Sequence, residues 1–364
     1  MSPLRRYLLP GFVFQSVVIA GGYGTGRELA EFFLSHGPLG GILAMALSTT
    51  VWSVVCVVSY EFARVFRAFD YRSFFQRLLG PGWIAFEVLY LALMMIVLAV
   101  IAAAAGSIME ETFGLPYLAG AIGILTLVGF LVFGGNRVME RAFAGWSGVL
   151  YLVYLIFFIL CVRNFGPAIH ASFAAGVAEA SWIRGGLEYA GYNLAVLPAV
   201  LITIRHHKSR RDTLIAGLLT GPIAMIPALL FFVAIAGEYP EIVVATVPVN
   251  HMLEMLGSRG FQIAFQVMLF GTLVETGAGM IHAVNERIAQ TYEESNRQLS
   301  PRTRVVAALG MLGLGALIAQ FGLETLIARG YGWITYGYLA VFVVPVLTWG
   351  AVLIRRWRGA NGRI

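Results

Sequence analysis

The sequence predicts an all-α integral membrane protein with ten spanning helices arranged as two halves of five. Three observations lead to this prediction. Hydrophobic residues make up 59% of the 364 residues and charged residues only 12%, whereas a soluble domain carries about 25% charged residues. Apolar runs of about 20 residues, the length that spans a bilayer, recur along the whole chain. Two of these runs are interrupted by glycines and polar residues at corresponding places in the two halves.

The ten expected spans divide the chain into a first half, residues 1–165, and a second half, residues 166–364. With five spans in each half, the second half starts in the opposite orientation, which makes the repeat inverted. The expected spans are residues 7–35, 37–63, 82–109, 116–135, 143–162, 183–204, 213–236, 260–284, 304–322 and 331–354.

Two connections between spans have patterns of their own. Residues 64–80 mix arginines with aromatic residues, which is typical of an amphipathic segment at the membrane surface. Residues 237–258 form a longer loop with two prolines and a late apolar patch. We expect this loop either to fold back as a lid or to pack on the outer surface.

The basic residues predict the topology. If both termini are cytoplasmic, the cytoplasmic segments hold 20 of the 25 Lys and Arg residues, as the positive-inside rule requires. Basic residues in short loops also argue against nucleic acid as a partner and for the lipid bilayer. Arg5 and Arg6 followed by an apolar run resemble a signal peptide, but the run continues past Ala20 without a cleavage-like site.

Glycines interrupt the first span in its middle. Gly21, Gly22, Gly24 and Gly26 each disfavour a helix by about 1 kcal/mol relative to alanine. The sixth span has a similar interruption at residues 185–193. Irregular backbone at membrane depth survives only where it lines a cavity or contacts a ligand, so the pair predicts a secondary transporter with its site between the two breaks. The alternative is that the glycines only allow close helix packing.

The stretch Gly21–Glu28 with Phe32 and Phe33, and the later Glu275–Gly279, resemble bacterial YkvI-type membrane proteins. The whole arrangement resembles the LeuT fold of the amino acid–polyamine–organocation superfamily. The resemblance implies helices one and six broken at the midplane, a bacterial inner-membrane location and no enzymatic activity.

The resemblance also implies a substrate site between the two breaks. In amino-acid transporters of this fold, the unwound first helix binds the substrate carboxylate. That role would fall on Gly22, Tyr23, Gly24, Thr25 and Gly26. The sixth helix would contribute Tyr189, Gly191, Tyr192 and Asn193, and the third helix would contribute Tyr90.

In sodium-coupled members of this fold, eighth-helix hydroxyls and first-helix carbonyls hold a sodium ion. Thr272 or Thr276 would supply the hydroxyl here, with the carbonyls of Ala20 or Tyr23 opposite. No other cofactor is expected.

Ionisable residues at membrane depth cost at least about 2.5–3.5 kcal/mol, so each is a functional candidate. Arg27, Glu28 and Glu31 follow the first break, where they form either a gate or, for Arg27 and Glu31, an internal neutralising pair. Glu188, before the second break, is a candidate for gating, or a partner for an arginine such as Arg184.

Glu275 is the strongest single candidate because it lies near the middle of the eighth span. Glu275, Gly279, His282 and Glu286 recur at helical spacing and form a stripe toward the cytoplasmic end. A carboxylate followed by an imidazole on one face is what a proton relay requires. The alternative for Glu275 is a structural, hydrogen-bonded acid. His282 and Glu286 alone would make a poor metal site.

These observations predict a secondary active transporter of a small zwitterion, an amino acid or related amine, coupled to H⁺ or Na⁺ by alternating access. Transport of a nucleobase-like heterocycle or an inorganic cation, or a channel, are the alternatives. The sequence shows no Gly-x-Ser-x-Gly or His-Glu-x-x-His pattern, so we expect no enzyme.

Overall fold

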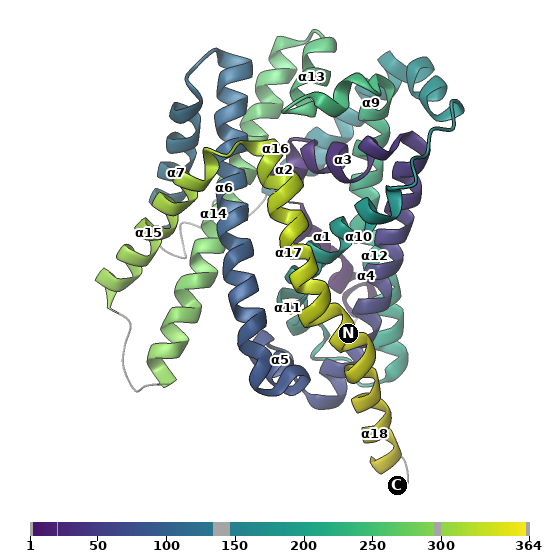
Figure 1. The fold of residues 1–364 in the computed structure, drawn as a ribbon, viewed down its shortest axis with the longest axis vertical. Coiled ribbons are helices and arrows are strands. Elements are labelled where there is room, and N and C mark those ends of the chain that lie inside the picture. Colours follow the sequence, from purple (N-terminus) through teal and green to yellow (C-terminus); the bar gives the residue numbers. More distant parts are fainter. Residues whose placement is uncertain (1–2, 20, 134–145, 295–299, 362–364) are drawn as a thin grey trace.

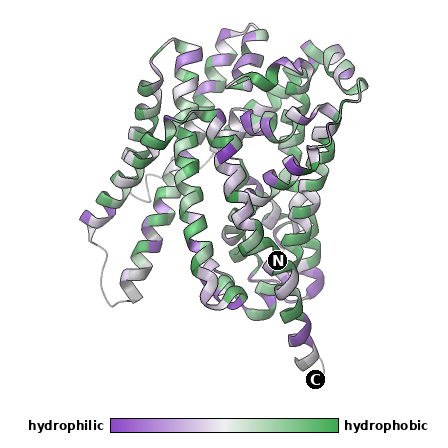
Figure 2. Cartoon of the chain, in the orientation of Figure 1, coloured by the Kyte–Doolittle hydropathy of each residue, from purple (hydrophilic) through white to green (hydrophobic). Residues whose placement is uncertain are grey.

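The computed structural model describes residues 3–19, 21–133, 146–294 and 300–361, which are almost entirely helical (Figure 1). Eight helical stretches within these ranges are long and apolar enough to cross a membrane. A shorter apolar helix, α7, and the interrupted first segment complete a set that is compatible with the ten expected spans. Figure 2 shows that hydrophobic residues dominate the long helices.

The first half begins with the interrupted segment. It consists of η1 (Leu4–Leu8), α1 (Leu9–Val18), α2 (Gly21–Gly24), α3 (Arg27–Phe32) and η2 (Leu34–His36). The elements that follow are α4 (Pro38–Phe66), α5 (Tyr71–Leu79), η3 (Gly80–Gly82), α6 (Trp83–Phe113), α7 (Tyr117–Phe133) and α9 (Trp146–Ala174). Helix α9 continues past residue 165, where the first half was expected to end, because its last ten residues carry a helix-compatible pattern despite Pro167.

The second half starts with a helix that changes type along its length. Its parts are α10 (Trp182–Asn193), η4 (Leu194–Val196), α11 (Leu197–Val200) and η5 (Leu201–Ile204). The middle elements are α12 (Arg210–Ile235), η6 (Ala236–Glu238), η7 (Glu241–Val244), α13 (Pro248–Met255), α14 (Arg259–Glu294) and α15 (Pro301–Ala319). The last segment comprises α16 (Leu323–Thr325), η8 (Leu326–Tyr331), α17 (Gly332–Tyr338), η9 (Leu339–Val343), η10 (Val346–Gly350) and α18 (Ala351–Asn361).

The helices gather into two groups. Helices α1, α4, α10 and α12 pack against one another, and α6, α7, α14 and α15 form the second group (Figure 1). The two groups come from both halves of the chain, so neither half forms a separate body. This arrangement leaves a seam between α1 and α10–α11 on one side and α6 and α14 on the other.

The amphipathic segment predicted after the second span forms helix α5. Asp70 caps its N-terminus by accepting a hydrogen bond from the Ser73 backbone N–H at 2.9 Å. Phe74 and Phe75 are buried on its inner face, and Phe75 stacks on Phe86 of α6 with ring centroids 3.5 Å apart. Helix α5 therefore lies across the lower end of the molecule in Figure 1.

The loop at residues 237–258 folds back over the first break, as the lid alternative predicts. The Val249 backbone N–H donates to the Thr25 carbonyl at 3.0 Å. The Arg27 guanidinium donates to the carbonyls of Val243 at 2.7 Å and Ala245 at 3.1 Å. The loop therefore covers α3 at the upper end of the molecule.

The N-terminal segment is held at the opposite end. A ring nitrogen of His207 lies 2.8 Å from the Arg6 carbonyl oxygen, and the Arg6 guanidinium lies 3.6 Å from the Asp212 carboxylate. His207 is 4% exposed, and this burial lowers its pKa below the ordinary histidine value. The ring in this contact is therefore harder to protonate than an exposed histidine ring.

Candidate functional site

The first span is interrupted as predicted. Helix α1 ends at Val18, α2 is a single turn, and α3 begins at Arg27. Gly26, between α2 and α3, has φ +78°, a left-handed conformation that side chains other than glycine disfavour. The Thr25 hydroxyl donates to the Gly22 carbonyl at 2.8 Å and stabilises the turn.

The sixth span differs from the expectation in where it becomes irregular. Residues 185–193, predicted to be the interruption, lie in regular helix α10, and the 3₁₀ segments η4 and η5 follow Asn193. Gly186 serves close packing, because a Cβ there would lie 2.7 Å from the Ala44 carbonyl oxygen. A Cβ at Gly191 would likewise meet the Thr335 side chain at 2.5 Å.

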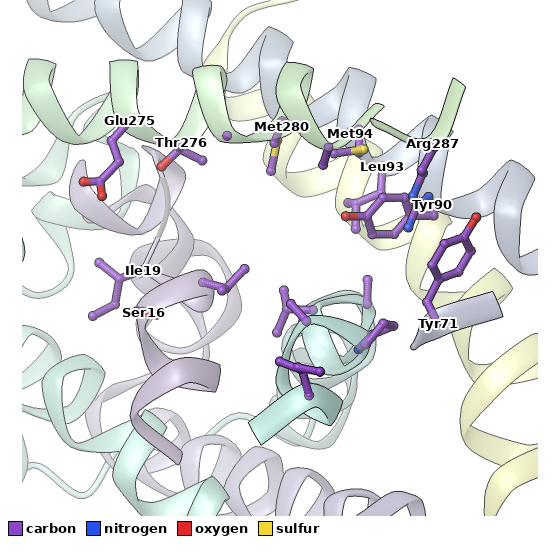
Figure 3. A pocket seen from close by; sticks show the side chains of 18 of the residues that line it. Ser16, Ile19, Tyr71, Tyr90, Leu93, Met94, Glu275, Thr276, Met280 and Arg287 are labelled. Carbon is purple, nitrogen blue, oxygen red and sulfur yellow. The ribbon is translucent and has the colours of Figure 1, made fainter. Parts of the chain in front are cut away.

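A cavity of about 760 Å³ lies in the seam between the two helix groups. Its walls come from α1, α6, α9, η4, α11, η5 and α14, together with Phe69, Asp70 and the first residue of α5, Tyr71. It extends along α14 from Glu275 and Thr276 to Arg287, beside Tyr90, as Figure 3 shows. Ser16, Ala199 and Ile202 of the lining are exposed, so the cavity is open to the outside of the molecule at the end where α5 lies.

Glu275 lies at the inner end of this cavity, near Ile19 at the end of α1 and beside Thr276 (Figure 3). Its side chain is partly exposed, and no hydrogen bond or ion pair joins it to another residue in the described part of the chain. The expectation of a structural, hydrogen-bonded acid therefore finds no partner among those residues. Glu275 is an acid facing an accessible space within a membrane-spanning helix.

The two threonines beside Glu275 use their hydroxyls within the helix. Thr272 donates to the Met268 carbonyl at 3.1 Å and accepts from the Trp146 indole N–H at 3.2 Å, while Thr276 donates to the Thr272 carbonyl at 2.9 Å. Tyr23 is fully buried and does not line the cavity. Ala20, the other expected sodium ligand, lies outside the described residues.

The opposite end of the cavity carries a cation. The Arg287 guanidinium lies 3.7 Å from the ring centroid of Tyr90 and 4.0 Å from that of Tyr71, and it forms an ion pair with Glu87 at 3.3 Å. Tyr90 was predicted to line the site. Arg287 was not, because the sequence places it among the cytoplasmic basic residues that set the topology. Of the predicted stripe, Gly279 lines the cavity with Glu275, His282 does not, and the Glu286 side chain lies outside the described residues.

A second polar cluster lies away from the cavity, in the buried interior around Glu28. Glu28 is 2% exposed, and its carboxylate accepts a hydrogen bond from the Tyr192 hydroxyl at 2.6 Å. The buried hydroxyls of Tyr23, Tyr154 and Tyr189 have no hydrogen-bond partner in the structure. We call Glu28 and these four tyrosines the tyrosine cluster.

The glycines of the first break allow the backbone to approach this cluster. A Cβ at Gly22 would lie 3.0 Å from Cγ and Cδ of Glu28 and closer still to its Oε1, and one at Gly24 would lie 3.1 Å from the Tyr154 hydroxyl oxygen. Of the residues predicted to bind substrate, Tyr90 lines the cavity, whereas Gly22 and Tyr192 lie against Glu28. Sequence reasoning missed Tyr154, because nothing in its neighbourhood distinguishes it from the other aromatic residues of α9.

The remaining predicted charges form pairs. The Arg27 guanidinium and the Glu31 carboxylate lie 2.5 Å apart, as the neutralising-pair alternative predicts. Glu188 pairs with Arg184 at 2.8 Å and accepts from the Tyr336 hydroxyl at 3.0 Å. The Asn193 side-chain amide donates to the Tyr189 carbonyl at 3.0 Å and thus caps α10.

No protein-family model matches the sequence. The chain is 23% identical over 320 residues to the uncharacterized membrane protein YkvI of Bacillus subtilis (strain 168), covering 85% of this chain and 88% of the relative.

Two solved structures resemble this one over almost the whole chain. A mutant of the manganese transporter from Eremococcus coleocola has a TM-score of 0.60 at 16% identity, covering 94% of this chain and 78% of that chain. MhsT in complex with L-phenylalanine has a TM-score of 0.59 at 13% identity, covering 98% of both chains. The protein therefore has the LeuT fold of all-helical, multi-pass membrane proteins.

Proposed function

We propose that the protein is a secondary active transporter of a small solute that bears an amino group, an amino acid or a related amine. The observation that carries this proposal is the cavity between the two helix groups, which ends at the unpartnered Glu275 beside the first break. Transporters of this fold alternate the access of such a site by moving one helix group against the other. The solved structures of similar fold, a manganese transporter and a protein bound to L-phenylalanine, support the assignment.

The proposed location is a bacterial inner membrane with both termini in the cytoplasm, which the distribution of basic residues favours. In this orientation the cavity opens to the cytoplasm, and the lid over α3 closes the external side. The structure then represents an inward-facing state.

We also propose that transport is coupled to a cation, H⁺ or Na⁺, and that Glu275 is the coupling acid. An acid in a membrane-spanning helix is costly unless it takes part in function, and Glu275 has no partner among the described residues to offset that cost. Glu28 is the proposed gating acid, since its bond to Tyr192 joins α3 to α10 across the two breaks.

The test is counterflow in proteoliposomes with a panel of amino acids, amines, nucleobases and Mn²⁺, with pH and Na⁺ varied separately. We expect exchange of an amino acid or amine and loss of coupled accumulation in Glu275→Gln. Glu179→Gln, which removes an exposed acid outside the cavity and outside the lid, is the matched control. Exchange of none of the amines or amino acids would overturn the substrate assignment. An unchanged pH and Na⁺ dependence in Glu275→Gln would overturn the coupling role.

A further inference from the structure

The charges that line the cavity are separated along its length. Glu275 stands at the inner end without a partner among the described residues. Arg287, the basic residue of the lining, stands twelve residues further along α14, which corresponds to about 18 Å of helix. Its guanidinium is already engaged by Glu87 and two tyrosine rings. A solute whose cationic group reaches Glu275 is therefore far from Arg287.

In the described part of the chain, the hydroxyls at the inner end are already engaged as donors, that of Tyr151 to the Gln15 side chain at 2.7 Å. The hydroxyls of Ser16 and Thr276 both donate to helix carbonyls, at 2.9 Å and 2.9 Å. The glycine turn of the first break, which would bind a carboxylate in amino-acid transporters of this fold, is buried and does not line the cavity. Glu28 lies directly over Gly22 and adds a second acid to that region.

The remaining surface of the cavity is mostly apolar. Leu93 and Met94 of α6, Leu150 of α9, Val196 of η4 and Met280 of α14 line it. Such a wall favours an apolar body, since burying apolar surface against it removes that surface from water. The solute is thus expected to combine one cationic group with an apolar body.

We propose that the cavity selects an organic amine without a carboxylate, whose ammonium group contacts Glu275 and whose apolar body lies against α6 and α9. This inference rests on the proposed function and gives Glu275 a direct contact with the solute besides its role in coupling. An α-amino acid fits this site less well. Its carboxylate carbon lies only two bonds from the ammonium nitrogen. When the ammonium group contacts Glu275, the carboxylate of the solute would be held near that of Glu275, without a counter-charge or a free donor.

The test measures binding to the detergent-solubilised full chain by calorimetry, with two matched series. One series is phenethylamine, phenylalanine and 3-phenylpropionate, and the other is isopentylamine, leucine and 4-methylpentanoate. In each series the three compounds differ only in their charged groups. We expect each amine to bind at least about tenfold more tightly than its amino acid, and the acids not to bind.

Two variants test whether Glu275 causes the preference for amines. Glu275→Gln should remove the advantage of the amine over the amino acid, whereas Glu179→Gln, at an exposed acid outside both the cavity and the lid, should keep it. Amino acids that bind as tightly as amines, no binding by either amine, or an amine preference that survives in Glu275→Gln would each overturn the inference. Flux of an amino acid in proteoliposomes without amine binding would overturn this inference and leave the proposed function standing. Amine binding without flux of any compound would do the reverse.

Discussion

At the scale of single residues, Gly22 and Glu28 depend on each other. The carboxylate of Glu28 occupies the space that a Cβ at Gly22 would need, and its other oxygen accepts from Tyr192. Burial makes this acid costly to ionise, so its hydrogen bond to Tyr192 and its place in the first turn of α3 both matter. The glycine is therefore required by one particular side chain as well as by backbone flexibility.

Gly22→Ala should destabilise the protein by about 1–3 kcal/mol, the usual cost of forcing a methyl group into a packed interior. It should also reduce exchange in proteoliposomes, because Glu28 must move. The control is Gly123→Ala, where a Cβ meets nothing within 4 Å and the exposed helix gains up to about 1 kcal/mol. Thermal unfolding in detergent measures both. Equal melting temperatures for the two variants would contradict the close approach at Gly22.

At the scale of elements, one buried acid joins three helices at the lower end of the molecule. Glu61 of α4 is 4% exposed; it pairs with Arg64 of the same helix at 2.7 Å and with Arg358 of α18. The Thr213 hydroxyl of α12 donates to it at 2.7 Å. Only Arg64 is near Glu61 in the sequence, so the other two partners depend on how the helices pack.

Glu61→Gln should lower the free energy of unfolding, because it leaves Arg64 and Arg358 without their counter-charge. Breaking a fully buried pair costs about 3–5 kcal/mol, and we expect roughly 1–3 kcal/mol here because the side chain of Arg358 is 32% exposed. Thermal unfolding of the purified protein gives the size of the change. Glu241→Gln, at an exposed acid, should leave the melting temperature within error, and the same result for Glu61→Gln would refute the role of this contact.

Some features of the helices follow from the sequence pattern, and others do not. Helix α5 was predicted from its mix of arginines and aromatic residues, and the first break was predicted from its glycines, since both signals are local. The irregular part of the sixth span was placed too early, because Gly186 and Gly191 look like helix breakers in the sequence but serve contacts with Ala44 and Thr335. Those contacts involve residues more than 100 positions away.

At the scale of the whole molecule, the two helix groups leave a cavity open at the end where α5 lies, while the lid of residues 237–258 covers the other end. This asymmetry is what an alternating-access protein shows in a state open to one side.

Two native cysteines are available as internal references for labelling. Cys56 and Cys161 are both fully buried.

Ser16→Cys should react with a membrane-impermeant maleimide from the side of the membrane that carries the termini, because Ser16 is exposed in the cavity. Leu115→Cys, at an exposed position between α6 and α7, should react from the opposite side. The unsubstituted protein should react slowly, because its cysteines are buried. Labelling of vesicles of known orientation measures the rates. Reaction of both variants from the same side would contradict the proposed topology of the cavity.

The sequence alone determined the membrane class, the approximate spans and the first break, and it singled out Glu275 as a candidate, because hydropathy, glycine clusters and a charge within an apolar run are local features. Only the tertiary structure decided that Glu275 faces an open cavity while Glu28 is buried among tyrosines. It also showed that Arg287 lies beside Tyr71 and Tyr90 at the other end of the same cavity. The physical reason is that a side chain's environment depends on helices from distant parts of the chain, and no local pattern encodes which helix faces which.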